Sequence, residues 1–166
     1  MTEQDDKKQE QKEVSLYEKI AARTEELMEE GKKTLDEALV KAREEIAAAG
    51  DFSREQAEKM SGFIRRDIAL MKEKEELSAD ALKRALDPQR VAAGIQSVLA
   101  GIMARTSGVL GDWAEKTEKQ LEFHTGEVTS IGTLTCKGCQ AEMRMKGTTR
   151  IPPCPKCHQT VFRKSY

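Results

Sequence analysis

The sequence is poor in aromatic residues and proline, and it has no long apolar run. Aromatic side chains make up 4% of its 166 residues, too few for a β-sandwich or a large α/β enzyme, because such sheets depend on aromatic and β-branched side chains. The mean hydropathy of −0.64 excludes a protein with several membrane spans. The most apolar stretch, 91–104, has fourteen residues and is followed by Arg105, which predicts a buried core helix rather than a membrane span.

A targeting segment is also missing at the N-terminus. Residues 1–13 consist almost entirely of glutamine and charged residues, without the apolar core that a signal peptide needs. This composition predicts a disordered charged tail. Without a secretory signal, we expect the protein to be cytoplasmic.

Charge, by contrast, is abundant: 34% of the residues are charged, yet the formal net charge is only −1. The near-neutral total hides a split, because residues 126–166 carry +5 and the preceding 125 residues carry −6. Such an asymmetry indicates two modules with different roles. A high content of Glu, Lys, Ala and Leu favours helices in the first module. We therefore predict a helical domain over 14–121 and a smaller domain over 122–166.

The helical domain is divided by start and stop signals. Apolar residues at three- and four-residue spacing predict a first helix over 14–31. Capping pairs at Thr34 with Glu37 and at Ser53 with Gln56 predict the starts of two further helices. A short helix over 78–86 follows. These segments predict a mainly α fold with an elongated body, arranged as an antiparallel coiled coil or a bundle.

A fourth helix is predicted over 88–121, where three glycines recur every seven residues at Gly94, Gly101 and Gly108. Glycine inside a helix costs about 1 kcal/mol relative to alanine, so the repeat needs a reason. We interpret it as close helix packing, either within the chain or in a homodimer formed through this helix. The alternative is a loose or kinked helix.

All four cysteines lie in the basic C-terminal part, as the pairs Cys136/Cys139 and Cys154/Cys157. Two such turns can close a tetrahedron of thiolates around one metal ion, so the spacing predicts a single structural Zn²⁺ without an open position for catalysis. Two disulfides or a rubredoxin-like iron site are the weaker alternatives. We expect the segment between the pairs to form a β-hairpin, and chelation to unfold this module while leaving the helices intact.

Predicted strands surround these turns at 127–135, 141–146 and 159–164. They predict a small C-terminal β zinc ribbon. Histidine follows the last cysteine at His158, a position where φ is often positive, and its side chain is expected to point away from the metal.

The motifs of this part resemble the YbeL-like family of bacterial zinc-ribbon proteins. The resemblance rests on the segment 124–128, on Gly132-x-Leu134-x-Cys136-x-x-Cys139, and on Pro153-Cys154-Pro155-Lys156-Cys157. It implies a charged helical body, a C-terminal ribbon and a cytosolic zinc-binding protein, and it leaves the biochemical role open.

These observations predict a non-enzymatic module that binds a macromolecule through the ribbon. Five basic residues are candidate contacts: Arg144, Lys146, Arg150, Arg163 and Lys164. A protein partner, such as transcription or translation machinery, is preferred, with nucleic acid as the alternative. A redox- or zinc-responsive regulator is a second hypothesis. An enzyme is disfavoured, because Glu142 is the only carboxylate between the cysteine pairs.

Overall fold

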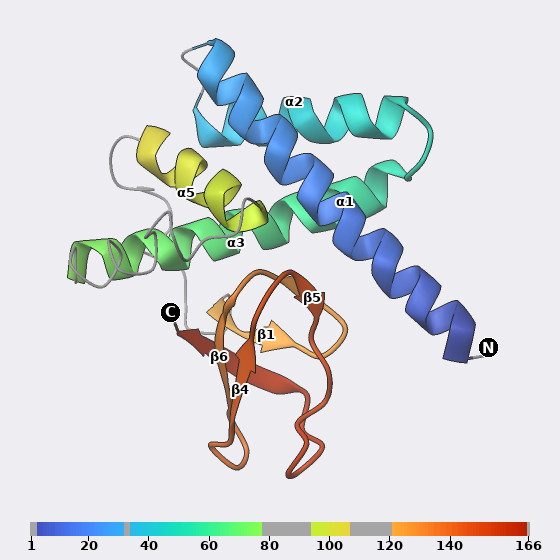
Figure 1. The fold of residues 1–166 in the computed structure, drawn as a ribbon, viewed down its shortest axis with the longest axis vertical. Helices are drawn as coiled ribbons and strands as arrows, with labels where there is room; N and C mark the ends of the chain where they lie inside the picture. Colours follow the sequence, from blue (N-terminus) through green and yellow to red (C-terminus); the bar gives the residue numbers. More distant parts are fainter. Residues whose placement is uncertain (1–2, 32–33, 78–93, 107–120, 166) are drawn as a thin grey trace.

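The structure is a computed structural model that describes residues 3–31, 34–77, 94–106 and 121–165. Its helices are α1 (Glu3–Glu30), α2 (Leu35–Ala48), α3 (Arg54–Leu77) and α5 (Ile95–Arg105). Its strands are β1 (Phe123–His124), β2 (Val128–Thr129), β3 (Gly132–Cys136), β4 (Glu142–Met145), β5 (Thr149–Arg150) and β6 (Val161–Ser165). The helices lie together, and the strands form a smaller unit packed against them (Figure 1). The predicted helical body and C-terminal ribbon are confirmed.

Both predicted capping pairs are present. The Thr34 hydroxyl accepts a hydrogen bond from the Glu37 amide at 3.3 Å, and the Glu37 carboxylate accepts one from the Thr34 amide at 3.0 Å. Ser53 and Gln56 make the same reciprocal pair at 3.1 and 2.9 Å. These bonds satisfy amides that the first turn leaves without helical partners, so they fix where α2 and α3 begin.

The predicted disordered tail is wrong. Helix α1 begins at Glu3, so residues 3–13 form its first three turns. The glutamines, glutamates and lysines of this segment are strong helix formers. The segment also gains partners in the ribbon, because Glu10 accepts a hydrogen bond from Thr149 at 3.4 Å and Glu13 lies 3.7 Å from Arg150.

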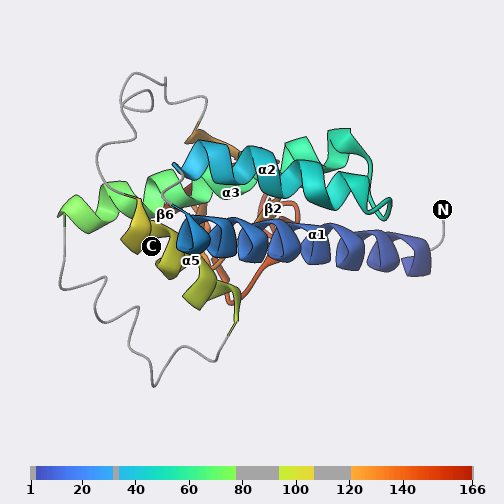
Figure 2. The same cartoon turned by 90° about the horizontal axis from the view of Figure 1, so that it is seen from above.

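The core of the body forms around α1, which contacts α2, α3 and α5. Figure 2 shows α1 lying between α2 and α5, with α3 behind them. The largest fully buried side chains of this cluster are Leu16, Tyr17, Ile20, Leu27, Ile64, Ile68, Leu99 and Ile102. One helix contacting three others makes the arrangement a bundle. None of the helices that the structure describes has the length and apolar character needed to cross a membrane.

Helix α5 covers only part of the helix predicted over 88–121. It begins after Gly94, whose extended backbone forms the N-cap, and it ends at Thr106, which is not helical. Residues 88–93 and 107–120, including Gly108, lie outside the described part of the chain, as does the short helix predicted over 78–86.

At Gly101 the space that a side chain would fill is occupied by a side chain of α1 in the same chain. A Cβ at this position would lie 1.9 Å from Oε1 of Glu25 on α1. Arg105, one turn further along α5, pairs with the same carboxylate at 3.6 Å. Leu99 and Ile102 are fully buried in the same interface. The apolar face of α5 therefore packs inside the chain, and the homodimer through the helix predicted over 88–121 stays a prediction.

The ribbon has a four-stranded antiparallel sheet in the order β1-β6-β3-β4 and a two-stranded pair, β2-β5. The predicted strand over 127–135 is divided between two sheets, because the chain bends at Ser130–Ile131 and Gly132 takes φ +145°. The predicted hairpin between the cysteine pairs is also wrong. Strand β4 pairs with β3, which precedes the first cysteine pair, and β5 pairs with β2.

Candidate metal centre and its connection to the helices

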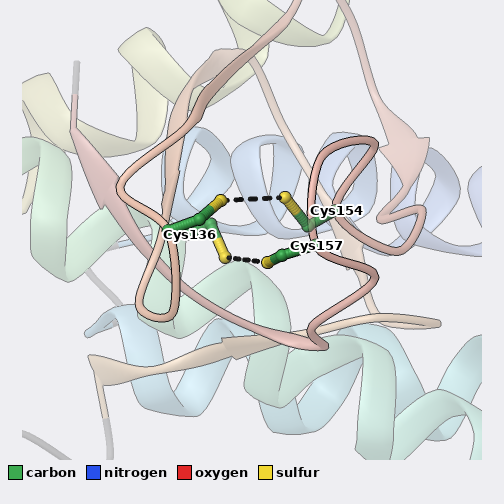
Figure 3. Close-up of side chains that lie close together, drawn as sticks. Cys136, Cys154 and Cys157 are labelled. Atoms are coloured by element: carbon green, nitrogen blue, oxygen red, sulfur yellow. Dashed lines mark hydrogen bonds between the residues drawn. The ribbon is translucent and has the colours of Figure 1, made fainter.

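The four cysteine sulfurs meet at one point. All four Sγ atoms lie within 4.8 Å of one another. Two of these pairs join the two turns, with 3.5 Å between Cys136 and Cys157 and 3.6 Å between Cys139 and Cys154. Figure 3 shows side chains of the two turns pointing toward each other across the gap. The grouping predicted from sequence spacing is thus present in the fold.

Each turn is closed by its own backbone. The Gln140 amide donates to the Cys136 carbonyl at 3.0 Å, and the His158 amide donates to the Cys154 carbonyl at 2.9 Å. Gln140 and His158, which follow the second cysteine of each pair, both take φ +59°. The positive φ predicted for His158 is confirmed, and its exposed side chain lies on the surface.

The distances between the sulfurs distinguish a metal site from a pair of disulfide bonds. All four cysteines are free, and their spacing exceeds the length of an S–S bond, which is about 2.05 Å. A tetrahedral zinc ion with Zn–S bonds of about 2.3 Å requires sulfurs about 3.8 Å apart. The observed spacing of 3.5 to 3.6 Å across the turns is close to this value. The donor set and its geometry therefore fit a tetrathiolate metal site.

The thiols also differ in how readily they ionise. The backbone amide of Cys157 donates to Cys154 and is the main cause that lowers the pKa of the Cys154 thiol to about 6. The Gln159 amide favours the Cys157 thiolate, but burial and the three neighbouring sulfurs outweigh it and raise the pKa of Cys157 to about 12. Sulfurs this close oppose each other's ionisation, and a bound cation removes that opposition.

The cysteine turns lie at the end of the ribbon away from the helices (Figure 1). Cys136 ends the central strand β3 and is paired with Phe162 of β6. The second turn, 154–157, is followed by β6 after three residues, and the Lys137 amide donates to the Val161 carbonyl at 3.0 Å. Both turns therefore fix how β3 and β6 lie against each other.

Three of the five candidate partner contacts lie on the surface. Arg144, Lys146 and Arg163 are exposed. Arg144 pairs in register with Thr133 on β3, and Arg163 pairs with Thr135. Because side chains alternate along a strand, these residues share the face of the sheet opposite to Leu134 and Phe162, which are buried.

Lys164 is a correction to the predicted surface contacts. Its side chain is fully buried, and its ammonium lies 3.1 Å from Oδ1 of Asp67 on α3. It also donates to the hydroxyls of Thr129 at 2.7 Å and Ser130 at 3.1 Å. The alternation of β6 explains the difference, since Lys164 faces the helices while its neighbour Arg163 faces away from them.

Arg150 is a partial correction for a similar reason. Its Nε donates to the Gly126 carbonyl at 3.1 Å and lies 3.7 Å from Glu13 of α1. Lys137 of the ribbon likewise pairs with Glu122. Part of the basic excess of the ribbon is thus neutralised by carboxylates of the same chain rather than presented to a partner.

Asp67 is the residue that the sequence reasoning missed. It is fully buried and accepts hydrogen bonds from the Tyr17 hydroxyl at 2.7 Å and the Ser130 amide at 2.9 Å. Burial alone would raise the pKa of its carboxyl, but the charge of Lys164, the Ser130 amide and the Tyr17 hydroxyl outweigh burial and lower it. A signal was present, because Asp67 falls at helical spacing among the apolar residues Ile64 and Met71.

Arg66 makes a second connection next to it. Its guanidinium donates to the Glu122 carbonyl at 3.0 Å and to the Glu127 carboxylate at 2.8 Å. It also lies 3.7 Å from the centre of the Phe123 ring, within the range of a cation–π contact. Arg66 therefore holds the segment through which the chain enters the ribbon.

The fold and the cysteine site together define a helical protein with a C-terminal zinc-ribbon domain. Residues 22–165 match the model of a family described as "Zinc-ribbon containing domain", and the chain belongs to this family. The chain is similar to the "Uncharacterized protein YbeL" of Escherichia coli, in strain K12 and in strain O157:H7, with 22% identity over 151 residues that cover 91% of this chain and 94% of each relative. No solved structure matches the chain. The predicted family resemblance is confirmed.

Proposed function

We propose that the protein is a non-enzymatic, zinc-binding interaction module of the cytoplasm. The zinc site is supported by the positions of four cysteine sulfurs. They come from two turns of the same ribbon and lie within 4.8 Å of one another. Cys136, Cys139, Cys154 and Cys157 would hold one Zn²⁺ with no position left for water or substrate, which is the arrangement of a structural site. A reducing compartment suits thiols that must stay free.

Metal analysis of the purified chain tests the site. We expect one zinc per chain, and loss of that zinc in a Cys154→Ser variant. Cobalt substitution gives a second readout, because a tetrahedral Co²⁺–thiolate site absorbs visible light and an octahedral one absorbs weakly. A matched control is Ser165→Ala, an exposed change in the same ribbon. Zinc below half an equivalent in the intact protein, or retained fully by the cysteine variant, contradicts the proposal.

The partner surface is the outer face of the four-stranded sheet. Arg144 and Arg163 lie on this face beside Thr133 and Thr135, their partners in register, and Glu142, which also pairs with Thr135, lies there too. With the exposed Lys146, which follows β4, these basic side chains outnumber that carboxylate. This face points away from the helical body, so a partner can reach it without moving the helices. We propose an acidic protein surface as its partner, as in a transcription or translation complex.

The aromatic residues favour protein over single-stranded nucleic acid. Binding of unpaired bases relies on aromatic side chains that are free to stack. Phe123 and Phe162 are both fully buried in the ribbon core. The outer face thus offers charge without a stacking platform, at least among the residues that the structure describes.

Affinity capture with charge variants tests this surface. The variant Arg144→Ala/Lys146→Ala/Arg163→Ala should lose partners that the intact chain captures from its host. Removal of three exposed charges on the helices, Lys7→Ala/Lys19→Ala/Lys41→Ala, is the matched control and should retain them. Equal capture by both variants contradicts the proposed surface. Steeply salt-dependent binding to DNA or RNA that only the ribbon variant loses would assign the surface to nucleic acid instead.

A regulatory role is the second candidate. Cys139 is exposed and Cys157 is half-buried, so an oxidant can reach two of the four proposed ligands. Oxidation of a thiolate ligand would release the metal. Mild peroxide with a zinc indicator tests the idea, and zinc that stays bound while free thiols in solution are oxidised contradicts it.

A further inference from the structure

The ribbon and the helical body share one buried polar cluster, formed by Tyr17, Asp67, Thr129, Ser130 and Lys164. All five residues have side chains without exposure to solvent, and they come from α1, α3, the β2 segment and β6. Asp67 is at the centre, because each of the other four donates a hydrogen bond to it. The cluster therefore closes only when the helices and the ribbon are in place together.

Strand β6 connects this cluster to the cysteine site. Lys164 lies two residues beyond Phe162, which pairs in register with Cys136. The turn that carries Cys154 and Cys157 is joined to β6 by the three residues 158–160, and the Cys154 amide donates to the carbonyl of Gln159 in this connection at 3.0 Å. A change in the cysteine turns displaces β6 at its first residues, and Lys164 is on the same short strand.

Besides its pairing with β1 and β3, strand β6 is held by a small core. This core consists of eight buried residues, of which two are the cysteines Cys136 and Cys154. A core this small depends on its metal, as metal-dependent modules of this size generally do. When β6 moves away, Asp67 loses its cation while staying buried among apolar side chains of the helices, and a buried charge without a partner is strongly destabilising.

We propose that zinc occupancy of the cysteine site is transmitted to the helical body through the Lys164–Asp67 pair, so that α1 and α3 are loosened when the metal is removed. This inference rests on the proposed zinc site. It reverses the expectation that chelation leaves the helices intact. It gives the protein a metal-dependent conformational response in its largest part, away from the metal itself.

Hydrogen exchange of the full chain, with and without a zinc chelator, tests the proposal. The readout is the exchange of backbone amides around Tyr17 and Asp67. We expect chelation to speed their exchange by about two orders of magnitude, because the released lysine leaves a buried charge unpaired. Helical amides that exchange at the same rate in both samples overturn the proposal.

A double variant, Asp67→Asn/Lys164→Met, tests the route. It removes both charges of the pair while approximately keeping the side-chain volumes, so chelation should speed helical exchange less than about tenfold. The variant Glu3→Gln/Lys7→Met removes an exposed pair of α1 and should keep the full response. A full response in the Asp67/Lys164 variant as well overturns the route. If that variant does not fold, hydrogen exchange of the intact chain with and without chelator still tests whether removal of zinc loosens the helices.

The two proposals fail in different ways. A purified chain that retains no zinc contradicts the zinc site itself. A chain that binds and releases zinc while its helical amides stay equally protected contradicts only the transmission.

Discussion

The ammonium of Lys164 lies 3.1 Å from Oδ1 of Asp67, and neither side chain is exposed to solvent. One residue belongs to the last strand of the ribbon and the other to helix α3. An ion pair taken fully out of water stabilises a fold only when its remaining hydrogen-bonding groups are satisfied. Here Tyr17, Thr129 and Ser130 supply those bonds, so the pair fixes the position of the ribbon on the body.

Removal of one member of this pair is the first prediction. Lys164→Met should lower the free energy of unfolding by about 3–5 kcal/mol, since it leaves the Asp67 carboxylate buried without its cation. The double variant with Asp67→Asn should recover a large share of this loss. Urea unfolding of both single variants and the double variant measures the coupling. Lys41→Met, in the exposed pair with Glu45, is the control and should change stability by less than about 1 kcal/mol.

Acid provides the second prediction. The pKa of the Asp67 carboxyl is lowered in the folded chain, so its contribution to stability is complete above its unfolded pKa of about 3.9 and is lost as the pH falls below that value. Unfolding experiments between neutral pH and pH 3 measure this loss. Thiol protonation also releases metal in acid, so the quantity to compare is the difference between the intact chain and Asp67→Asn. That difference should shrink as the pH falls, and a constant difference contradicts the prediction.

Tyr17→Phe is the third prediction. The change removes only the hydroxyl that donates to Asp67 at 2.7 Å. Since Asp67 keeps its other donors, the loss should be about 1–3 kcal/mol, smaller than that of Lys164→Met. Thermal unfolding measures it, and the zinc content should stay unchanged. A loss as large as that of Lys164→Met contradicts the assignment of Lys164 as the main partner.

Gly132 provides the fourth prediction. It takes φ +145°, and a Cβ there would lie 2.7 Å from Cε of Lys164 and 3.0 Å from the Ser165 carbonyl. Gly132→Ala should therefore strain the backbone and push against Lys164, with a loss of about 1–3 kcal/mol. Gly147→Ala is the matched control in the same ribbon, because nothing lies within 4 Å of its Cβ position. Equal stability of the two variants contradicts the prediction.

Local patterns predicted much of this molecule. The starts of α2 and α3 follow from capping pairs whose two members are three residues apart. The cysteine site follows from two short turns with fixed spacing, and the φ of His158 follows from its place after the second turn. In each case the residues that decide the structure are close together in the sequence, so a short window contains the needed information.

Features that depend on distant partners were predicted poorly. Lys164 and Arg150 are basic residues like Arg144, and nothing in the local sequence sets them apart. They differ from Arg144 because they contact acidic residues of the helices, Asp67 and Glu13. Residues 3–13 look like a disordered tail until Glu10 and Glu13 are seen beside the ribbon. The charge split predicts a basic surface for a partner. Some of these basic side chains instead hold the two modules of the chain together.

The spacing of the partners of Asp67 along the chain has a consequence for folding. Tyr17 is 50 residues away, Ser130 is 63 residues away and Lys164 is 97 residues away. Contacts between such distant segments form late and slow folding down. During synthesis, Tyr17 and Asp67 emerge long before β6. The Asp67 carboxylate therefore lacks its cationic partner until β6 has been made. Strand β6, which is made after the helices that it contacts, completes the buried polar cluster to which Tyr17 and Asp67 belong.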